Sequence, residues 1–166
     1  MQGMKPLILA GLLFAANNTA SAAVVTWNLV NVTFDDGGSA YGSFVYDTAT
    51  KTVHQIDVYT TEGAHLPGRH YVALAGVWGR SANSGILAFT DRMDPVDYTG
   101  ASWLRMDFFD IVRTTQTGVS LKMQKEVGAE SFCTNKNCSS AANELSNPGK
   151  SRKIISGHIE SVQSLP

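Results

Sequence analysis

Hydrophobic and polar residues alternate along most of the chain after residue 23, which is the pattern of half-buried β-strands. No segment keeps the helical period, and Gly, Pro, Asn and Asp residues separate the alternating runs. The runs predict strands over these ranges: Ala23–Phe34, Tyr41–Asp47, Thr52–Thr61, Arg69–Trp78, Gly85–Thr90, Trp103–Arg113, Gly118–Gln124 and Arg152–Gln163. Because no crossover helices separate them, we predict an all-β fold, a jelly-roll-like two-sheet antiparallel β-sandwich of about eight strands.

The alternation also predicts which side chains share a face of their strand. In the run Gly118–Gln124, the hydrophobic residues Val119, Leu121 and Met123 are expected to face inward. In the run Thr52–Thr61, His54, Ile56 and Val58 are expected to share one face, and in the run Arg152–Gln163, Ile155 and Ile159 are expected to do so.

Turn-forming residues set the expected connections. Asp35-Asp36-Gly37-Gly38 follows the first strand, and Asp-Gly is a strong hairpin signal because both residues tolerate positive φ. Loops are expected over Glu62–Gly68 and Asp91–Ser102, and a polar loop rich in Gly, Asn and Ser over Ala129–Lys150.

The N-terminal residues have the three parts of a secretory signal peptide. Lys5 supplies a positive charge, Leu7–Ala16 is an uncharged apolar run, and Ala20-Ser21-Ala22 is a cleavage site. The apolar run is shorter than the roughly 20 residues that span a bilayer as a helix. We predict a signal peptide at residues 1–22 and one domain at residues 23–166, exported to the periplasm or the extracellular space without a transmembrane segment. A retained anchor or a buried core helix is the alternative.

Export would place the two cysteines, Cys133 and Cys138, in an oxidising compartment. The polar residues between them favour a turn that brings the two ends together. We predict a local disulfide, which pins one loop because it closes only a short stretch of chain. Half of a zinc site is the alternative, although no second Cys or His pair lies nearby in the sequence.

Composition narrows the function classes. Hydrophobic residues make up 43% of the chain and charged residues 16%, which excludes a disordered charged tail. The formal net charge of -1 offers no broad basic surface, so we expect no nucleic-acid partner. The sequence has no G-x-S-x-G, Walker, G-x-G-x-x-G or H-E-x-x-H motif, so we predict no catalytic residue.

Calcium is the candidate cofactor, and its candidate ligands are Asp35, Asp36 and Asp47. These carboxylates flank the first hairpin from either end and are hard ligands that suit calcium. A second candidate metal site, for zinc or copper, combines Glu62 with His65 and His70 around a Pro-Gly loop.

Asp107 and Asp110 resemble an acid/base pair in the sequence. On a regular strand, however, residues three apart point to opposite faces, so only a bulge would reunite them. Arg105 shares a face with Asp107, and we expect these two residues to form a surface ion pair.

Aromatic residues offer a third kind of site, because Trp and Tyr rings stack on sugars in carbohydrate-binding modules. We take Trp78, Tyr98 and Trp103 as candidate ligand-binding residues, with Trp27 as a further aromatic of the same kind. Packing in the core of the β-sandwich is the alternative for each of them.

Part of the chain resembles the exported bacterial proteins of the PEP-CTERM group. The resemblance is carried by Trp27-x-Leu29, by Val32–Gly38, Ala40, Gly42–Phe44 and Tyr46-Asp47, and towards the end by the pair Cys133 and Cys138, by Arg152 and by Ile155–Gly157. It implies an exported β-sandwich and brings no catalytic residue. Members of that group carry a C-terminal sorting signal with a transmembrane helix and a basic tail. The sequence ends at Ser164-Leu165-Pro166 without one, so we expect a released form.

These observations favour a non-catalytic structural, matrix or binding protein, with extracellular polysaccharide or other matrix proteins as its expected partners. A carbohydrate-binding module that uses exposed aromatic residues is the first alternative. A small secreted hydrolase is the second, and it would need the histidine loop or Asp107 to act in catalysis.

Overall fold

The computed structural model describes residues 24–47, 49–50, 52–75, 85–93, 96–108, 118–137 and 149–163. All helical or strand structure in these ranges is β-strand, which confirms the predicted all-β class. The predicted signal peptide lies outside the described residues, as do Trp78, Asp110 and Cys138.

Ten strands follow one another along the described chain. Their bounds are β1 (Val24–Phe34), β2 (Ser39–Asp47), β3 (Thr52–Thr60), β4 (Arg69–Tyr71), β5 (Ala73–Leu74), β6 (Ile86–Thr90), β7 (Ser102–Asp107), β8 (Ser120–Lys122), β9 (Ala129–Phe132) and β10 (Arg152–Gln163). Each predicted run overlaps at least one of them. The two additional strands arise from a break at Val72 and from β9, which lies where the sequence predicts only a polar loop.

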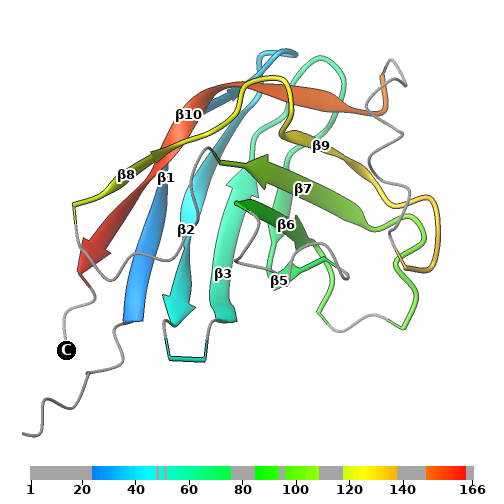
Figure 1. The fold of residues 1–166 in the computed structure, drawn as a ribbon. Helices are drawn as coiled ribbons and strands as arrows, with labels where there is room; N and C mark the ends of the chain where they lie inside the picture. The colour runs from blue at the N-terminus through cyan, green and yellow to red at the C-terminus, as the bar shows by residue number, and fades with distance from the viewer. Residues whose placement is uncertain are drawn as a thin grey trace, which may run out of the picture.

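The strands form one nearly closed, barrel-like sheet (Figure 1). Its order is β4-β3-β2-β1-β10-β9-β7-β6-β5, β8 also pairs with β10, and all pairs between the described strands are antiparallel. The two ends of this order meet because Val72 alone separates β4, which pairs with β3, from β5, which pairs with β6. The predicted two-sheet sandwich is therefore not confirmed.

Residues with positive φ lie on four neighbouring strands of this sheet. They are Gly157 in β10 (φ 126°), Asn31 in β1 (51°), Gly42 in β2 (113°) and Gln55 in β3 (49°). The pairing registers of these strands shift in the same region, as they do at β-bulges. A bulge bends its strand and increases the local twist, so bulges on adjacent strands curl the sheet towards closure.

The bulge at Gly157 decides which residues of β10 face the core. Ile154 and Ile159 are fully buried, whereas Ile155 is 41% exposed. The prediction that Ile155 and Ile159 share a face is wrong, because it assumed regular alternation and the bulge adds one residue between them.

The bulge at Gln55 has the same effect on β3. Ile56 and Val58 belong to the main core, and Val53 packs against the same core. The prediction that His54 shares a face with Ile56 and Val58 is therefore wrong. In β8, where no such residue intervenes, the prediction is confirmed. Leu121 and Met123 are buried there, and Val119 packs against the same core.

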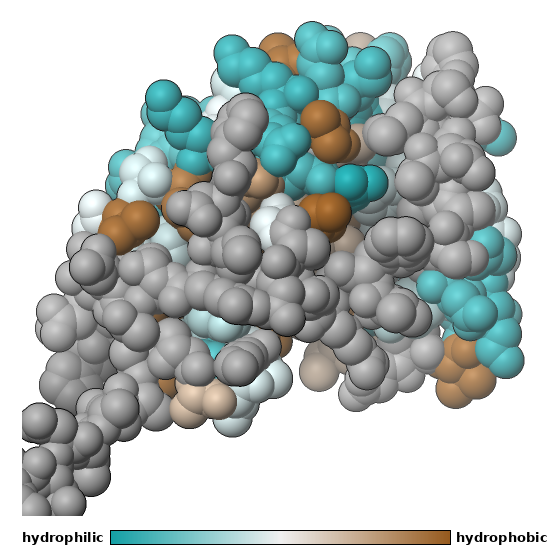
Figure 2. Space-filling model, in the orientation of Figure 1, coloured by the Kyte–Doolittle hydropathy of each residue, from teal (hydrophilic) through white to brown (hydrophobic). Residues whose placement is uncertain are grey.

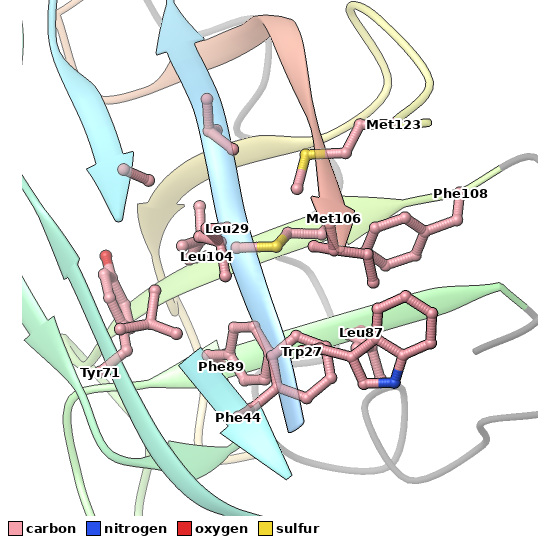
Figure 3. Packing of buried hydrophobic residues seen from close by; sticks show 14 of the residues in the cluster. Trp27, Leu29, Phe44, Tyr71, Leu87, Phe89, Leu104, Met106, Phe108 and Met123 are labelled. Carbon is pink, nitrogen blue, oxygen red and sulfur yellow. The ribbon is translucent and has the colours of Figure 1, made fainter. Parts of the chain in front are cut away.

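Hydrophobic side chains fill the inside of the sheet and form the main core (Figure 3). Trp27 of β1 and Phe44 of β2 are fully buried, and the Phe44 ring lies 5.4 Å from the ring of Phe89 in β6. Burial of one such phenylalanine contributes about 1.5–3 kcal/mol to the free energy of unfolding. These contacts therefore tie the first strands of the chain to the strands of its middle.

A second, smaller cluster covers β6 and β7. Its buried members are Ala75, Ala88, Ala101, Trp103 and Cys133, and Tyr98 packs against them. Ala88 lies between Leu87 and Phe89 of the main core, so the second cluster occupies the opposite face of the sheet.

Candidate functional site

A buried group of polar and charged residues gathers where β9 and β10 begin. We call it the charged cluster, and its members are Asp36, Thr60, Tyr71, Glu130 and Arg152. The Oε1 atom of Glu130 accepts hydrogen bonds from the Tyr71 hydroxyl at 2.7 Å and from Thr60 Oγ1 at 3.0 Å. Its Oε2 atom accepts one from Arg152 Nε at 2.7 Å. Arg152 Nη2 lies 2.6 Å from the same oxygen, although it is not aligned for a hydrogen bond.

Asp36 reaches the same guanidinium from the β1–β2 turn. Arg152 Nη1 lies 3.4 Å from each carboxylate oxygen of Asp36, which also accepts hydrogen bonds from the backbone N–H groups of Gly38 and His65. Burial raises the pKa of Asp36, but the backbone hydrogen bonds and the charge of Arg152 outweigh it and hold this pKa below its ordinary value. The Arg152 guanidinium also lies 4.3 Å from the centroid of the Phe34 ring.

Two glycines leave room for the charged cluster. A Cβ atom at Gly38 would collide with the Arg152 guanidinium, and one at Gly63 would collide with the Asp36 carboxylate. The Asp-Asp-Gly-Gly run therefore does more than form a hairpin. Gly37 provides the positive φ of 87° that the turn needs, while Gly38 makes space for a buried cation.

Burial sets what the charged cluster can do chemically. The side chains of Asp36 and Arg152 are 0% exposed and that of Glu130 is 2% exposed. Burial raises the pKa of Glu130, although hydrogen bonds from Tyr71 and the charge of Arg152 oppose this effect. Burial also raises the pKa of Tyr71 well above its ordinary value. A substrate in solution has no access to these groups, so the cluster joins turns and strands rather than performing chemistry.

The three carboxylates predicted as calcium ligands do not come together. Asp35 Oδ1 accepts a hydrogen bond from the Lys153 backbone N–H, and Asp36 belongs to the charged cluster. Asp47 lies at the opposite end of β2. Hydrogen bonds from the backbone of Thr50 and Ala49 lower the pKa of Asp47. Within the described ranges, no three His, Cys, Asp or Glu residues are grouped so as to hold a metal ion.

The three aromatic candidates that the structure describes are not exposed platforms. Trp103 is only 2% exposed, Tyr98 is half-buried against the same second cluster, and Trp27 is fully buried in the main core. Trp78 lies outside the described residues. For Trp103, Tyr98 and Trp27, the structure therefore favours the core-packing alternative, because each of them packs in or against one of the two hydrophobic clusters.

The remaining polar candidates are also separated. His70 Nε2 lies 2.8 Å from Asp57 Oδ1, whereas the His65 backbone N–H donates to Asp36, so the two histidines do not form one site. The ion pair of Arg105 and Asp107 is confirmed, with 2.6 Å between Nη2 and Oδ1. It is more buried than the expected surface pair, since the Asp107 side chain is 4% exposed.

Cys133 is buried in the second cluster, and the described chain contains no free cysteine. Cys138, its predicted partner, lies outside the described residues, so the pairing of these two residues stays a prediction.

An exposed row of rings crosses β2, β3 and β4. Tyr41, Tyr59 and His70 are direct neighbours in the pairing registers, and we call this row the ring ladder. The rings of Tyr41 and Tyr59 lie 5.4 Å apart, and those of Tyr59 and His70 lie 4.1 Å apart and almost parallel at 3°. A hydrogen bond to Asp57 raises the pKa of Tyr59, and Asp57 also holds His70. Sequence reasoning missed the ring ladder because it exists only once the register is known.

A groove of about 700 Å³ lies beside β8 and β10, and we call it the β8–β10 groove. Its lining includes Asn31, Lys122, Lys125, Gly157 and His158. Figure 2 shows hydrophilic residues gathered at the upper end of the molecule, where the β8–β9 connection and β10 lie in Figure 1. The volume is within the range of small-ligand sites, and polar side chains converge on the groove from several strands.

Comparison with protein-family models, with curated proteins and with solved structures found no match. In the part of the chain that the structure describes, no helix has the length and apolar character to cross a bilayer.

Proposed function

We propose that this chain is an exported bacterial β-protein without catalytic activity, which binds an extracellular polysaccharide or another component of the matrix. The observation that carries this proposal is the ring ladder. Tyr41 is 53% exposed, and its ring, together with those of Tyr59 and His70, lies on an accessible face of β2, β3 and β4.

The ring ladder has the chemistry that sugar recognition uses. Tyr41 stands at the end of the row, and among the described residues Tyr59 is its one stacked aromatic neighbour. Tyr41 is still 53% exposed, which leaves ring surface available to a sugar. The Asp57 carboxylate and the tyrosine hydroxyls offer hydrogen bonds to sugar hydroxyls. Because the rings already support one another, binding orders few side chains and loses little conformational entropy.

A non-catalytic role is favoured by the use of the buried carboxylates. Glu130 is engaged by Arg152, and Asp107 by Arg105, and the side chains of both acids are almost entirely buried. Groups held in this way stabilise the fold and are not free to act as acids or bases on a polymer outside it.

Affinity electrophoresis through gels that contain single polysaccharides tests the binding proposal. We expect the wild-type protein to be retarded by at least one polysaccharide, and Tyr41→Ala to migrate faster than the wild type in that gel. Val96→Ala is the matched control, because Val96 is 86% exposed and is not part of the ring ladder. Retardation by no polysaccharide, or turnover of a glycan that is lost with one carboxylate, would contradict the proposal.

Export is the second part of the proposal, and it rests on the three-part leader and on the resemblance to the PEP-CTERM group. We expect the mature protein, isolated from the periplasm or the medium, to begin at Ala23. N-terminal sequencing of fractionated protein measures this directly. Protein with an intact leader in the cytosol would contradict export without bearing on polysaccharide binding.

A further inference from the structure

We propose that the β8–β10 groove binds a carboxylate-bearing segment of an acidic polysaccharide. This inference deepens the proposed function and rests on it. It concerns a surface distinct from the ring ladder, which lies on β2, β3 and β4.

Two lysines give the groove its positive charge. Lys122 and Lys125 line it, and neither forms an ion pair with the described residues. His158 pairs with Lys122 in the register of β8 and β10 and lies 2.9 Å from Glu160 Oε1 through its Nε2 atom. Among the described lining residues there is no carboxylate, and Glu160 borders the groove through its contact with His158.

The floor of the groove is held in place by the two bulges. Asn31 and Gly157 both have positive φ, and a Cβ at Gly157 would lie 2.7 Å from the backbone of Val32, so the strands approach one another closely there. Ser156 fixes this arrangement by donating a hydrogen bond from Oγ to the Asn31 carbonyl at 3.0 Å. The wall is fixed in turn by Gln124, whose Nε2 donates to the Phe108 carbonyl at 2.8 Å. A preformed floor and wall lower the entropy that binding costs.

The lining matches the chemistry of a uronic-acid sugar. Lysine ammonium groups pair with a carboxylate, and the Asn31 amide and the Ser120 hydroxyl can exchange hydrogen bonds with ring hydroxyls. Val127, which is 39% exposed, offers apolar surface to the C–H groups of a sugar ring.

The charge around the groove favours a polymer that is less densely charged than a nucleic-acid duplex. Glu160 lies next to His158, Glu126 follows Lys125, and the whole chain has a net charge of -1. A densely charged polyanion such as a nucleic acid would meet repulsion just outside the groove. A polysaccharide with one carboxylate per sugar has a wider charge spacing than the roughly 1.7 Å of a nucleic-acid duplex, so it places fewer charges near the glutamates when one carboxylate reaches the lysines.

The test compares two double variants that change the net charge equally. Lys122→Gln/Lys125→Gln removes the ammonium groups of the groove, and Lys136→Gln/Lys150→Gln removes two exposed ones outside its lining. Binding to polygalacturonate and to neutral dextran is measured by titration calorimetry at low salt and at high salt. Circular dichroism checks that each variant is folded.

We expect the groove variant to bind polygalacturonate about tenfold more weakly than the wild type, roughly the value of one lost ion pair at a preformed site. The control variant should bind like the wild type. High salt should weaken only the part of the polygalacturonate affinity that depends on Lys122 and Lys125. Inorganic phosphate in excess should compete less effectively than galacturonate, because the groove also contacts the sugar ring.

Two results overturn the inference alone. The first is an equal loss of affinity for polygalacturonate in both double variants. The second is a groove variant that binds the polymer as tightly as the wild type does, while Tyr41→Ala still weakens that binding. Displacement by phosphate but not by galacturonate also overturns it, since the site would then be a phosphate site. Absence of binding to any polysaccharide overturns both the inference and the proposed function.

Discussion

The charged cluster and the β8–β10 groove both use polar residues of β10, yet burial gives them opposite roles. Arg152, near the start of β10, has a side chain that is 0% exposed and faces the carboxylates of Glu130 and Asp36. Further along the same strand, His158 lines an open groove with the exposed Lys122. A charge removed from water must be paired, so it fixes structure, whereas a hydrated charge can remain unpaired for a partner.

The strongest test of this comparison removes the buried cation. Arg152→Ala leaves two carboxylates buried without their partner, and we expect the free energy of unfolding to fall by about 3–5 kcal/mol. Urea denaturation followed by tryptophan fluorescence measures the change. Arg92→Ala is the control, because Arg92 is exposed and its loss should cost less than about 0.5 kcal/mol.

If Arg152→Ala does not fold, Arg152→Lys gives the intermediate case. It keeps the charge but loses the planar fork that contacts Glu130 and Asp36 together, so its stability should lie between those of the wild type and Arg152→Ala. Wild-type stability for Arg152→Lys would show that the guanidinium geometry does not matter.

A second test acts on the bulge between the two regions of β10. Gly157→Ala places a Cβ against Val32 at a φ of 126°, and we expect a loss of about 1–3 kcal/mol. Gly149→Ala is the matched control, since Gly149 has a φ of 81° but no atom within 4 Å of its added Cβ. Its thermal unfolding should therefore shift less. Equal shifts in the two variants would mean that backbone strain, and not the close approach of β1, makes glycine necessary at Gly157.

A third test concerns the solvent side. Tyr41→Ala removes one ring of the exposed ladder, and we expect a loss of about 0.5–1 kcal/mol in the free energy of unfolding. The same variant should lose most of its retardation in the polysaccharide gel, although its free energy of unfolding changes little. A large loss of stability with unchanged binding would assign the ring ladder to the fold and not to recognition.

The smallest expected effect is that of pH, because two shifts oppose one another. Burial raises the pKa of Glu130 above 4.5, so the folded protein holds this proton more tightly and the free energy of unfolding falls as pH rises above 4.5. The pKa of Asp36 lies below 3.8 in spite of its burial, so stability is also lost as pH falls below 3.8.

Denaturation of the wild type across this range should therefore show maximal stability in the acidic region near these values. Glu130→Gln should remove the decline on the high-pH side and retain the decline on the low-pH side. Parallel profiles of the wild type and Glu130→Gln would show that Glu130 does not titrate differently in the folded state.

Local pattern was enough to find the strands, but it did not reveal the candidate sites. The Asp-Asp-Gly-Gly run was recognised as a hairpin, yet the role of Gly38 depends on Arg152, which is distant in the sequence. Glu130 lies in a stretch that looks like a polar loop, because its burial depends on three partners from other strands. The same limit explains why Trp103, a candidate binding residue in the sequence, is buried, whereas Tyr41, which no local pattern singles out, is exposed.

Alternation and turn residues by themselves determined the all-β class, most of the strands and the first hairpin, because these depend on neighbours within a few residues. Only the tertiary structure decided how the sheet closes, which face follows each bulge and which charges are buried. Those outcomes depend on a one-residue shift between strands far apart in the sequence, and such a shift leaves no trace in local composition.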